Sequence, residues 1–250
     1  MIAFDPLFGY SVSGDTIGEA WLSAVECVIK NGTYDPDENR GRHAIQMLRL
    51  KVRSHGTPDA LVEKYGNAEN IAKMKRLVFD SPVMEDFDVS PNFRKGAKSY
   101  QARLAEGRMI DFVVKRLTEI PESKKAVMVF PTYEDYAKVL DSPHNDYLPC
   151  IVSLQFRLRK TPDGDYVLNT VYTMRSQDIY QKNVSDLIVF SLLAQDVGKR
   201  LSANLNAHVR MGFIDGMITD AHVYSNTYDD ALATTSSYLN AGTATCRTTV

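Results

Sequence analysis

Residues 150–175 read CIVSLQFRLRKTPDGDYVLNTVYTMR, and this stretch decides the fold class. Two runs rich in β-branched and aromatic residues, 150–159 and 166–175, flank the segment TPDGD at 161–165. Proline, aspartate and glycine are the residues that tight turns favour, through their backbone geometry or their side-chain hydrogen bonds. The pattern therefore predicts two strands joined as a β-hairpin.

Further strands and helices are predicted on both sides of this hairpin. The clearest helix is 16–30, because Asp15 or Thr16 can cap its start, an apolar stripe follows, and Gly32 ends it. Strands are predicted at 43–52, 126–130 and 208–224, and helices at 104–117, 183–197 and 225–239, while 58–79 carries broken helical periodicity. Since strands and helices occur in separate runs, the sequence predicts an α+β fold.

No repeat, low-complexity linker or domain boundary interrupts the chain, so 1–250 is interpreted as a single domain. Its hydrophobic fraction of 44% is enough for a sizeable core. The segment 240–250 is small and polar, which predicts a mobile tail.

Net charge and cysteine content restrict the possible partners. The formal net charge of −2 does not indicate nonspecific binding to nucleic acid or to a membrane surface. No apolar run reaches membrane-spanning length, and no signal peptide is visible at the start. Cys27, Cys150 and Cys246 form neither a disulfide framework nor a metal-binding spacing. Free thiols are typical of a reducing compartment, so the sequence predicts a cytoplasmic protein without a metal.

Two neighbouring segments contain candidate chemistry. Cys150 follows a proline in YLPCIVSLQF, and a lone cysteine at a strand start is more often an inert core residue than a nucleophile. A nucleophile needs a nearby cation or helix end, and the local sequence supplies neither. Arg175 and Ser176 end the second strand of the hairpin. They form either a solvated strand end or a phosphate grip made by a guanidinium fork and a hydroxyl.

Three further features are ambiguous by themselves. Asp186 precedes an almost wholly apolar run, so it is either a carboxylate near a helix N-terminus or a carboxyl directed into a pocket. His222 and Tyr224 are two residues apart, which places both on one face of a strand. Lys124 and Lys125 form a solvated turn or supply charge to a phosphate.

Taken together and in order, these segments resemble the thymidylate synthase family. The similarity extends over about residues 99–229 and is poor before them. The ordered set comprises YQARL at Tyr100, SKKAVMVF at Lys124 and Lys125, LPC at Cys150, LQF after it, RSQD at Arg175, then Asp186, and DAHVYSN at His222. Each motif is weak alone, and the ordered set is fairly specific.

The resemblance implies a fold, an assembly and a set of residue roles. The fold is a mixed α+β domain whose sheets pack back to back in a homodimer, so that each active site borrows basic residues from the other subunit. Those residues are Lys124 and Lys125, where most relatives have arginines. The remaining implied roles are phosphate binding by Arg175, Ser176 and either Arg40 or Arg42, sugar binding by His222 and Tyr224, folate contact by Asp178, proton removal by Tyr100, and water management by Glu63 or, failing that, Glu69.

The implied reaction modifies carbon 5 of a pyrimidine nucleoside monophosphate. The Cys150 thiolate attacks carbon 6, and carbon 5 then becomes nucleophilic enough to attack the one-carbon unit of 5,10-methylenetetrahydrofolate. Arginines that bind the phosphate also favour the thiolate. After loss of tetrahydrofolate, hydride gives a methyl group and water gives a hydroxymethyl group.

Asp186 distinguishes between branches of the family. Thymidylate synthases have asparagine there, whose amide matches the ring N–H and carbonyl of uracil. Cytosine presents the reverse pattern, which a protonated carboxyl matches, and aspartate here resembles the cytidylate hydroxymethylases. Ile151 agrees, because methylating members usually have histidine after the cysteine. The sequence thus predicts hydroxymethylation of dCMP or CMP, with a methyltransferase acting on dUMP or UMP, and a non-catalytic nucleotide-binding homologue, as the alternatives.

Overall fold

The computed structural model describes residues 3–5, 9–37, 40–56, 58–84, 97–142 and 147–245. Within these residues, nine strands form a single mixed sheet in the order β1-β2-β4-β9-β7-β6-β5, with β3 paired to β4 and β8 paired to β9. The strands are β1 (Ala3–Asp5), β2 (Gly9–Gly14), β3 (Thr33–Asp37), β4 (Arg40–Val52), β5 (Val127–Val129), β6 (Ile151–Lys160), β7 (Tyr166–Met174), β8 (Gln177–Asp178) and β9 (Val209–Tyr224). The helices are α1 (Ile17–Asn31), α2 (Ala60–Tyr65), α3 (Ala68–Phe79), α4 (Tyr100–Glu106), α5 (Met109–Glu119), α6 (Tyr133–Asp141), α7 (Asn183–Leu205) and α8 (Tyr228–Thr245), with a 3₁₀ turn at Ser225–Thr227.

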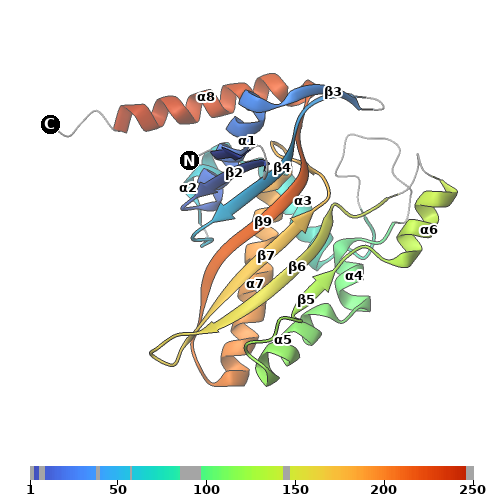
Figure 1. The fold of residues 1–250 in the computed structure, drawn as a ribbon, viewed down its shortest axis with the longest axis vertical. Coiled ribbons are helices and arrows are strands. Elements are labelled where there is room, and N and C mark those ends of the chain that lie inside the picture. The colour runs from blue at the N-terminus through green and yellow to red at the C-terminus, as the bar shows by residue number, and fades with distance from the viewer. Residues whose placement is uncertain are drawn as a thin grey trace.

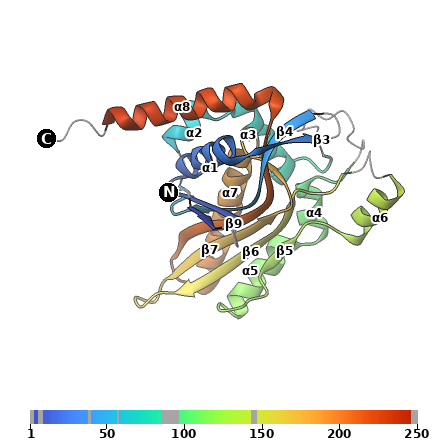
Figure 2. The ribbon, with the colours of Figure 1, turned by 45° about the horizontal axis from the view of Figure 1, so that its top comes forward.

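Helices cover one face of the sheet. Figure 1 shows α7 running behind β9, β7 and β6, with α5 beside β5. At the other end of the molecule α1 packs on β2 and β4, and α8 lies across α1 (Figure 2). In the part of the chain that is described, no helix covers the strand face turned to the viewer in Figure 1. The structure therefore confirms a mixed α+β architecture.

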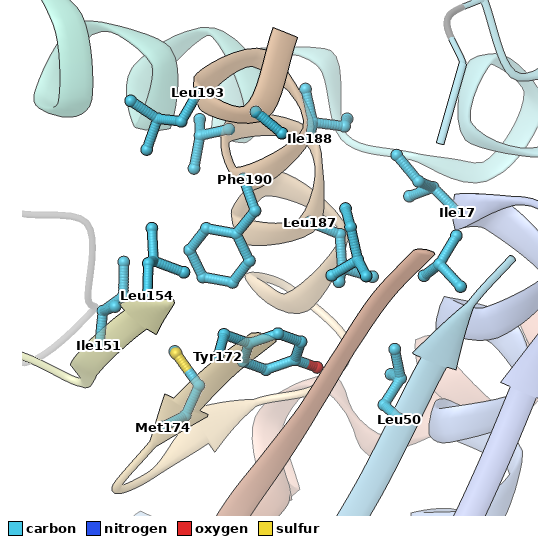
Figure 3. Close-up of a cluster of buried hydrophobic side chains, with 14 of the residues drawn as sticks. Ile17, Leu50, Ile151, Leu154, Tyr172, Met174, Leu187, Ile188, Phe190 and Leu193 are labelled. Carbon is cyan, nitrogen blue, oxygen red and sulfur yellow. The ribbon is translucent and has the colours of Figure 1, made fainter. Parts of the chain in front are cut away.

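The core lies between α7 and the strands in front of it. Phe190 of α7 lies over the sheet, with its ring centroid 5.1 Å from that of Tyr172 on β7 and with Leu154 of β6 nearby (Figure 3). Nearly every residue in the first half of α7 is buried, which explains why its sequence is apolar on all sides rather than amphipathic. Burial of this apolar surface is the main favourable term that holds the helix to the sheet.

The helix and the hairpin that the sequence predicts most clearly are confirmed. The hydroxyl of Thr16 accepts a hydrogen bond from the backbone N–H of Glu19 at the start of α1, and Gly32 caps its end. Strands β6 and β7 are antiparallel, and the turn between them places Gly164 at a φ of +94°. Only glycine adopts that backbone conformation without steric cost.

Other predicted boundaries are wrong. The helix predicted at 104–117 is two helices, α4 and α5, because Gly107 ends the first and Arg108 adopts a left-handed conformation before the second. Residues 240–245 continue α8, whereas the sequence predicts the helix to end at 239. The rest of the predicted tail, 246–250, lies outside the described residues.

Several elements of the fold have no clear signal in the local sequence. Strands β1, β2, β3 and β8 and helix α6 were not predicted. Strand β2 pairs in parallel with β4, a partner far away in the sequence, so its pairing depends on the assembled sheet. Among the described residues, no helix is long and apolar enough to cross a membrane.

Candidate active site

A cavity of about 230 Å³ opens where the start of β4 and the ends of β8 and β9 meet the start of α7 and the start of β6. Sheet register brings its residues together, because Arg42 pairs with Tyr224 and Asp178 pairs with His222. The lining residues are Arg42, Cys150, Met174, Arg175, Ser176, Gln177, Asp178, Lys182, Asp186, His222 and Tyr224. Most of the residues singled out in the sequence thus share one cavity.

Arg175 holds the chain segment that leads into Cys150. Its backbone N–H donates to the carbonyl of Cys150 at 3.0 Å, and its guanidinium donates to the carbonyls of Pro149 at 3.2 Å and Leu148 at 2.8 Å. Cys150 is half-buried just before β6. A guanidinium from the end of β7 therefore holds the backbone of the segment before Cys150 in place.

Asp186 is a buried carboxyl with one oxygen hydrogen-bonded and the other without a hydrogen-bond partner among the described residues. Its side chain lies in the first turn of α7 and is 3% exposed. Gln177 Nε2 donates to Asp186 Oδ2 at 2.7 Å, and Asn183 fixes the Gln177 amide by donating to its Oε1 at 2.8 Å. No described residue hydrogen-bonds Asp186 Oδ1. Burial raises the pKa of Asp186 to about 7, so the neutral acid is well populated near neutral pH.

A chain of charged groups orients His222. Asp220 Oδ1 lies 2.8 Å from His222 Nδ1 and accepts a second hydrogen bond from Arg42 Nη1 at 3.1 Å. Burial opposes the ionisation of Asp220, but the hydrogen bond from His222 and the charges of His222, Arg42 and Arg175 keep its pKa below the usual value. A carboxylate can only accept, so Nδ1 carries a proton. In the neutral ring, Nε2 is then the acceptor that remains for a ligand hydroxyl.

The two candidate arginines have different positions. Arg42 lines the cavity and also pairs with Asp35, whose Oδ2 lies 2.8 Å from Nη2. The Arg40 guanidinium lies over the ring of Tyr224, 4.0 Å from its centroid. Arg40 thus contacts a residue of the cavity wall but is not itself among the lining residues.

Asp178 lines the cavity and also fixes the turn that leads into α7. Its Oδ1 accepts from the backbone N–H groups of Tyr180 at 3.1 Å and Gln181 at 3.0 Å, and its Oδ2 accepts from Gln181 Nε2 at 2.8 Å. These bonds hold its carboxylate at the cavity edge.

Tyr100 lies against the cysteine segment although it is absent from the cavity lining. Its side chain is buried at the start of α4, and its hydroxyl oxygen accepts from the Ile151 N–H at 3.4 Å. Phe130 packs edge-on against the ring at 5.5 Å between centroids. Burial raises the pKa of Tyr100, and negative charge on Cys150 or Asp186 raises it further.

Four predicted residues lie away from this cavity. Glu63 and Glu69 are exposed on α2 and α3, since α2 directs Val62 inward and leaves Glu63 facing solvent. Lys124 and Lys125 are exposed in the turn before β5. The structure thus does not bring Glu63 to the site of its own chain.

Several polar residues of the site were not predicted from the sequence. Gln177 and Asn183 are buried amides that fix Asp186, Lys182 lines the cavity, and Asp220 binds His222. Only Asp220 has a sequence signal, because it precedes His222 by two residues on the same strand face. Within the described ranges, no group of histidine, cysteine and acidic side chains could hold a metal ion.

Comparisons with known proteins find two curated relatives that share one name. A protein of Methanosarcina barkeri named "Putative thymidylate synthase" is 22% identical over 223 residues, which are 88% of this chain and 92% of that protein. A protein of Methanothermobacter marburgensis with the same name is 25% identical over 232 residues, which are 89% and 96% of the two chains. These similarities support a relationship between this chain and the thymidylate synthase family. No family model matches the sequence, and the similarity does not distinguish between branches of that family.

Proposed function

We propose that this protein hydroxymethylates carbon 5 of a cytidine monophosphate, dCMP or CMP, with 5,10-methylenetetrahydrofolate and water as co-substrates. The proposal has two parts. The one-carbon transfer rests on the resemblance to thymidylate synthases, on the names of the two relatives and on the cavity that contains Cys150. The choice of cytosine rests on Asp186.

The observation that carries the proposal is the buried carboxyl of Asp186. Its Oδ1 is buried without a hydrogen-bond partner among the described residues, its Oδ2 is held by Gln177, and its pKa is raised to about 7. A protonated carboxyl donates to the unprotonated ring nitrogen of cytosine and accepts from the exocyclic amino group. The orphaned oxygen thus gains a partner when cytosine binds.

Uracil fits the same carboxyl less well. Because Oδ2 accepts from Gln177, the acid proton is assigned to Oδ1, and the pairing with cytosine directs Oδ1–H at the ring nitrogen. In the same pose the ring N–H of uracil meets another donor, so one buried polar pair is mismatched. Such a mismatch costs about 1–3 kcal/mol, which corresponds to roughly five- to 150-fold in specificity. Gln177 and Asn183 strengthen the selection, because they fix the orientation of the carboxyl before the base arrives.

Roles for the remaining residues come from the resemblance and are compatible with their positions. Cys150 is the nucleophile that attacks carbon 6, and Arg175 positions it. Arg42, Arg175 and Ser176 are assigned to the phosphate, and Tyr100 to removal of the carbon 5 proton. His222, through Nε2, and Tyr224 are assigned to the sugar hydroxyl, and Asp178 to the folate. The folate supplies the one-carbon unit, and water completes the hydroxymethyl group.

The proposal includes a homodimer formed through the uncovered face of the sheet. That face carries partly buried apolar side chains, including Val171, Phe213 and Met217. Lys124 and Lys125 are exposed and absent from the cavity of their own chain, which is compatible with a contribution to the partner's phosphate site. A dimer interface of this kind would also bury the apolar side chains.

The decisive experiment measures tritium release from carbon 5 of labelled dCMP, CMP and dUMP, each with 5,10-methylenetetrahydrofolate. We expect release from a cytidylate, its loss in Cys150→Ala, and a product whose mass corresponds to hydroxymethylation. Asp186→Asn should shift the ratio of kcat/KM values toward dUMP. Release from dUMP alone would instead identify a thymidylate-type methyltransferase, and nucleotide binding without release would identify a non-catalytic homologue.

A further inference from the structure

A second tyrosine lies beside Tyr100 at the cysteine segment. Tyr147 is three residues before Cys150, and its side chain is hydrogen-bonded to that of Tyr100. The Tyr100 oxygen also accepts the Ile151 N–H at 3.4 Å. Once Tyr100 gives up its hydroxyl proton, its oxygen can therefore accept two hydrogen bonds, from groups on either side of Cys150 in the sequence.

A buried ion pair lies next to Tyr147. The Arg103 guanidinium carbon is 5.9 Å from the centroid of the Tyr147 ring. Asp135 holds Arg103 by two hydrogen bonds of 2.6 and 2.7 Å, and the Phe130 carbonyl accepts a third at 2.9 Å. Because Arg103 cannot move freely, its positive charge stays fixed near the Tyr147 ring, where it makes the phenol a stronger donor.

Tyr100 needs such donors if it is to handle a proton. Burial and negative charge on Cys150 or Asp186 raise its pKa, so an isolated phenol at this position would resist gaining negative charge. The hydrogen bonds from Tyr147 and from the Ile151 N–H act in the opposite direction. They are also preorganised in a buried environment, where donors aimed at developing charge contribute most.

We propose that Tyr147 is a positioning residue that acts through Tyr100 in the removal of the carbon 5 proton. This inference rests on the proposed function. In that step the carbon 5–hydrogen bond breaks, and its electron pair forms the exocyclic double bond. The bond from the one-carbon unit to tetrahydrofolate breaks, and the folate nitrogen keeps that electron pair. Tyr100 first releases its hydroxyl proton to water, and the Tyr147 hydroxyl and the Ile151 N–H stabilise the resulting negative charge on its oxygen. That oxygen then takes the proton from carbon 5, so Tyr100 ends the step as a neutral phenol.

The test is Tyr147→Phe, which keeps the ring beside Arg103 and removes only the hydroxyl. We expect the kcat for tritium release to fall about tenfold or more with an unchanged KM for the nucleotide. The tritium isotope effect should rise, because proton removal becomes slower than the other steps. Tyr136→Phe, which alters an exposed tyrosine of α6, is the matched control and should behave like the wild type.

A 5-fluorocytidylate separates this role from a packing role. Fluorine cannot leave carbon 5 as a cation, so the reaction stops after Cys150 attack and one-carbon transfer, before proton removal. Formation of this adduct, measured by mass spectrometry of the intact protein, should proceed at the wild-type rate in Tyr147→Phe. In Tyr100→Phe we expect the same pattern, and the double variant should be no slower than Tyr100→Phe.

Three outcomes would overturn the inference. Wild-type turnover in Tyr147→Phe would show that its hydroxyl is not used, and a parallel loss of adduct formation and turnover would show that it only supports packing. If the wild-type protein forms no adduct and releases no tritium from any nucleotide, the proposed function itself fails and this role fails with it.

Discussion

Replacing Asp186 by asparagine should remove a pH-dependent loss of stability. Burial raises the pKa of this carboxyl from 3.8 to about 7 in the folded protein. Because the folded state holds the proton more tightly than the unfolded chain, the stabilising contribution is complete below pH 3.8 and disappears as the pH rises through about 7. A pKa difference of this size corresponds to about 4 kcal/mol in total, or about 1.4 kcal/mol per pH unit within the window.

The measurement is urea unfolding of the nucleotide-free protein at fixed protein concentration, from about pH 5 to about pH 8. The free energy of unfolding of the wild type should decrease with pH more steeply than that of Asp186→Asn, so that the variant becomes relatively more stable at the alkaline end. Asp141→Asn, which removes an exposed carboxylate at the end of α6, should follow the wild-type slope. Parallel slopes for the wild type and Asp186→Asn would refute the argument that Asp186 is held neutral by burial.

Three further substitutions test individual contacts. Asp220→Asn should lower kcat/KM for the nucleotide about tenfold, because His222 loses the acceptor that fixes its Nδ1 proton; an unchanged steady-state value would contradict that role. Asp135→Asn breaks a buried bidentate ion pair and should cost about 3–5 kcal/mol in urea unfolding, and a loss near zero would show that the pair is dispensable. Gly216→Ala places a Cβ 2.3 Å from the ring of Tyr172 and should lower the free energy of unfolding by about 1–3 kcal/mol. A double variant that also carries Tyr172→Leu should recover part of this loss. The absence of any loss would mean that the ring moves freely.

Local sequence patterns predicted an element correctly where the residues that start, form and end it lie within one short segment. The helix α1 has its cap, its apolar stripe and its terminating glycine within one stretch, and the hairpin of β6 and β7 has its turn residues between two strand-forming runs. The division between α4 and α5 was not predictable in the same way. It depends on the left-handed conformation of Arg108, a residue with no particular preference for that geometry.

Candidate residues were recognisable from the sequence, but their partners were not. Cys150, Asp186 and His222 stand out through motif order and local context. The groups that determine their chemistry come from other elements: Arg175 from the end of β7, Gln177 from β8 and Arg42 from β4. Motif spacing cannot supply these contacts, because hydrogen bonds between distant segments depend on sheet register.

By itself, the sequence determined the mixed α+β class, the principal helix and hairpin, and a resemblance that singled out most of the cavity residues in advance. Only the tertiary structure decided that Asp186 is buried with one oxygen unpartnered, that Glu63 faces solvent, and that Tyr147 contacts Tyr100. The physical reason is that periodicity and turn chemistry act over a few neighbouring residues. Burial, pKa shifts and hydrogen-bond networks arise only when β4, β8, β9 and α7 meet at one end of the sheet.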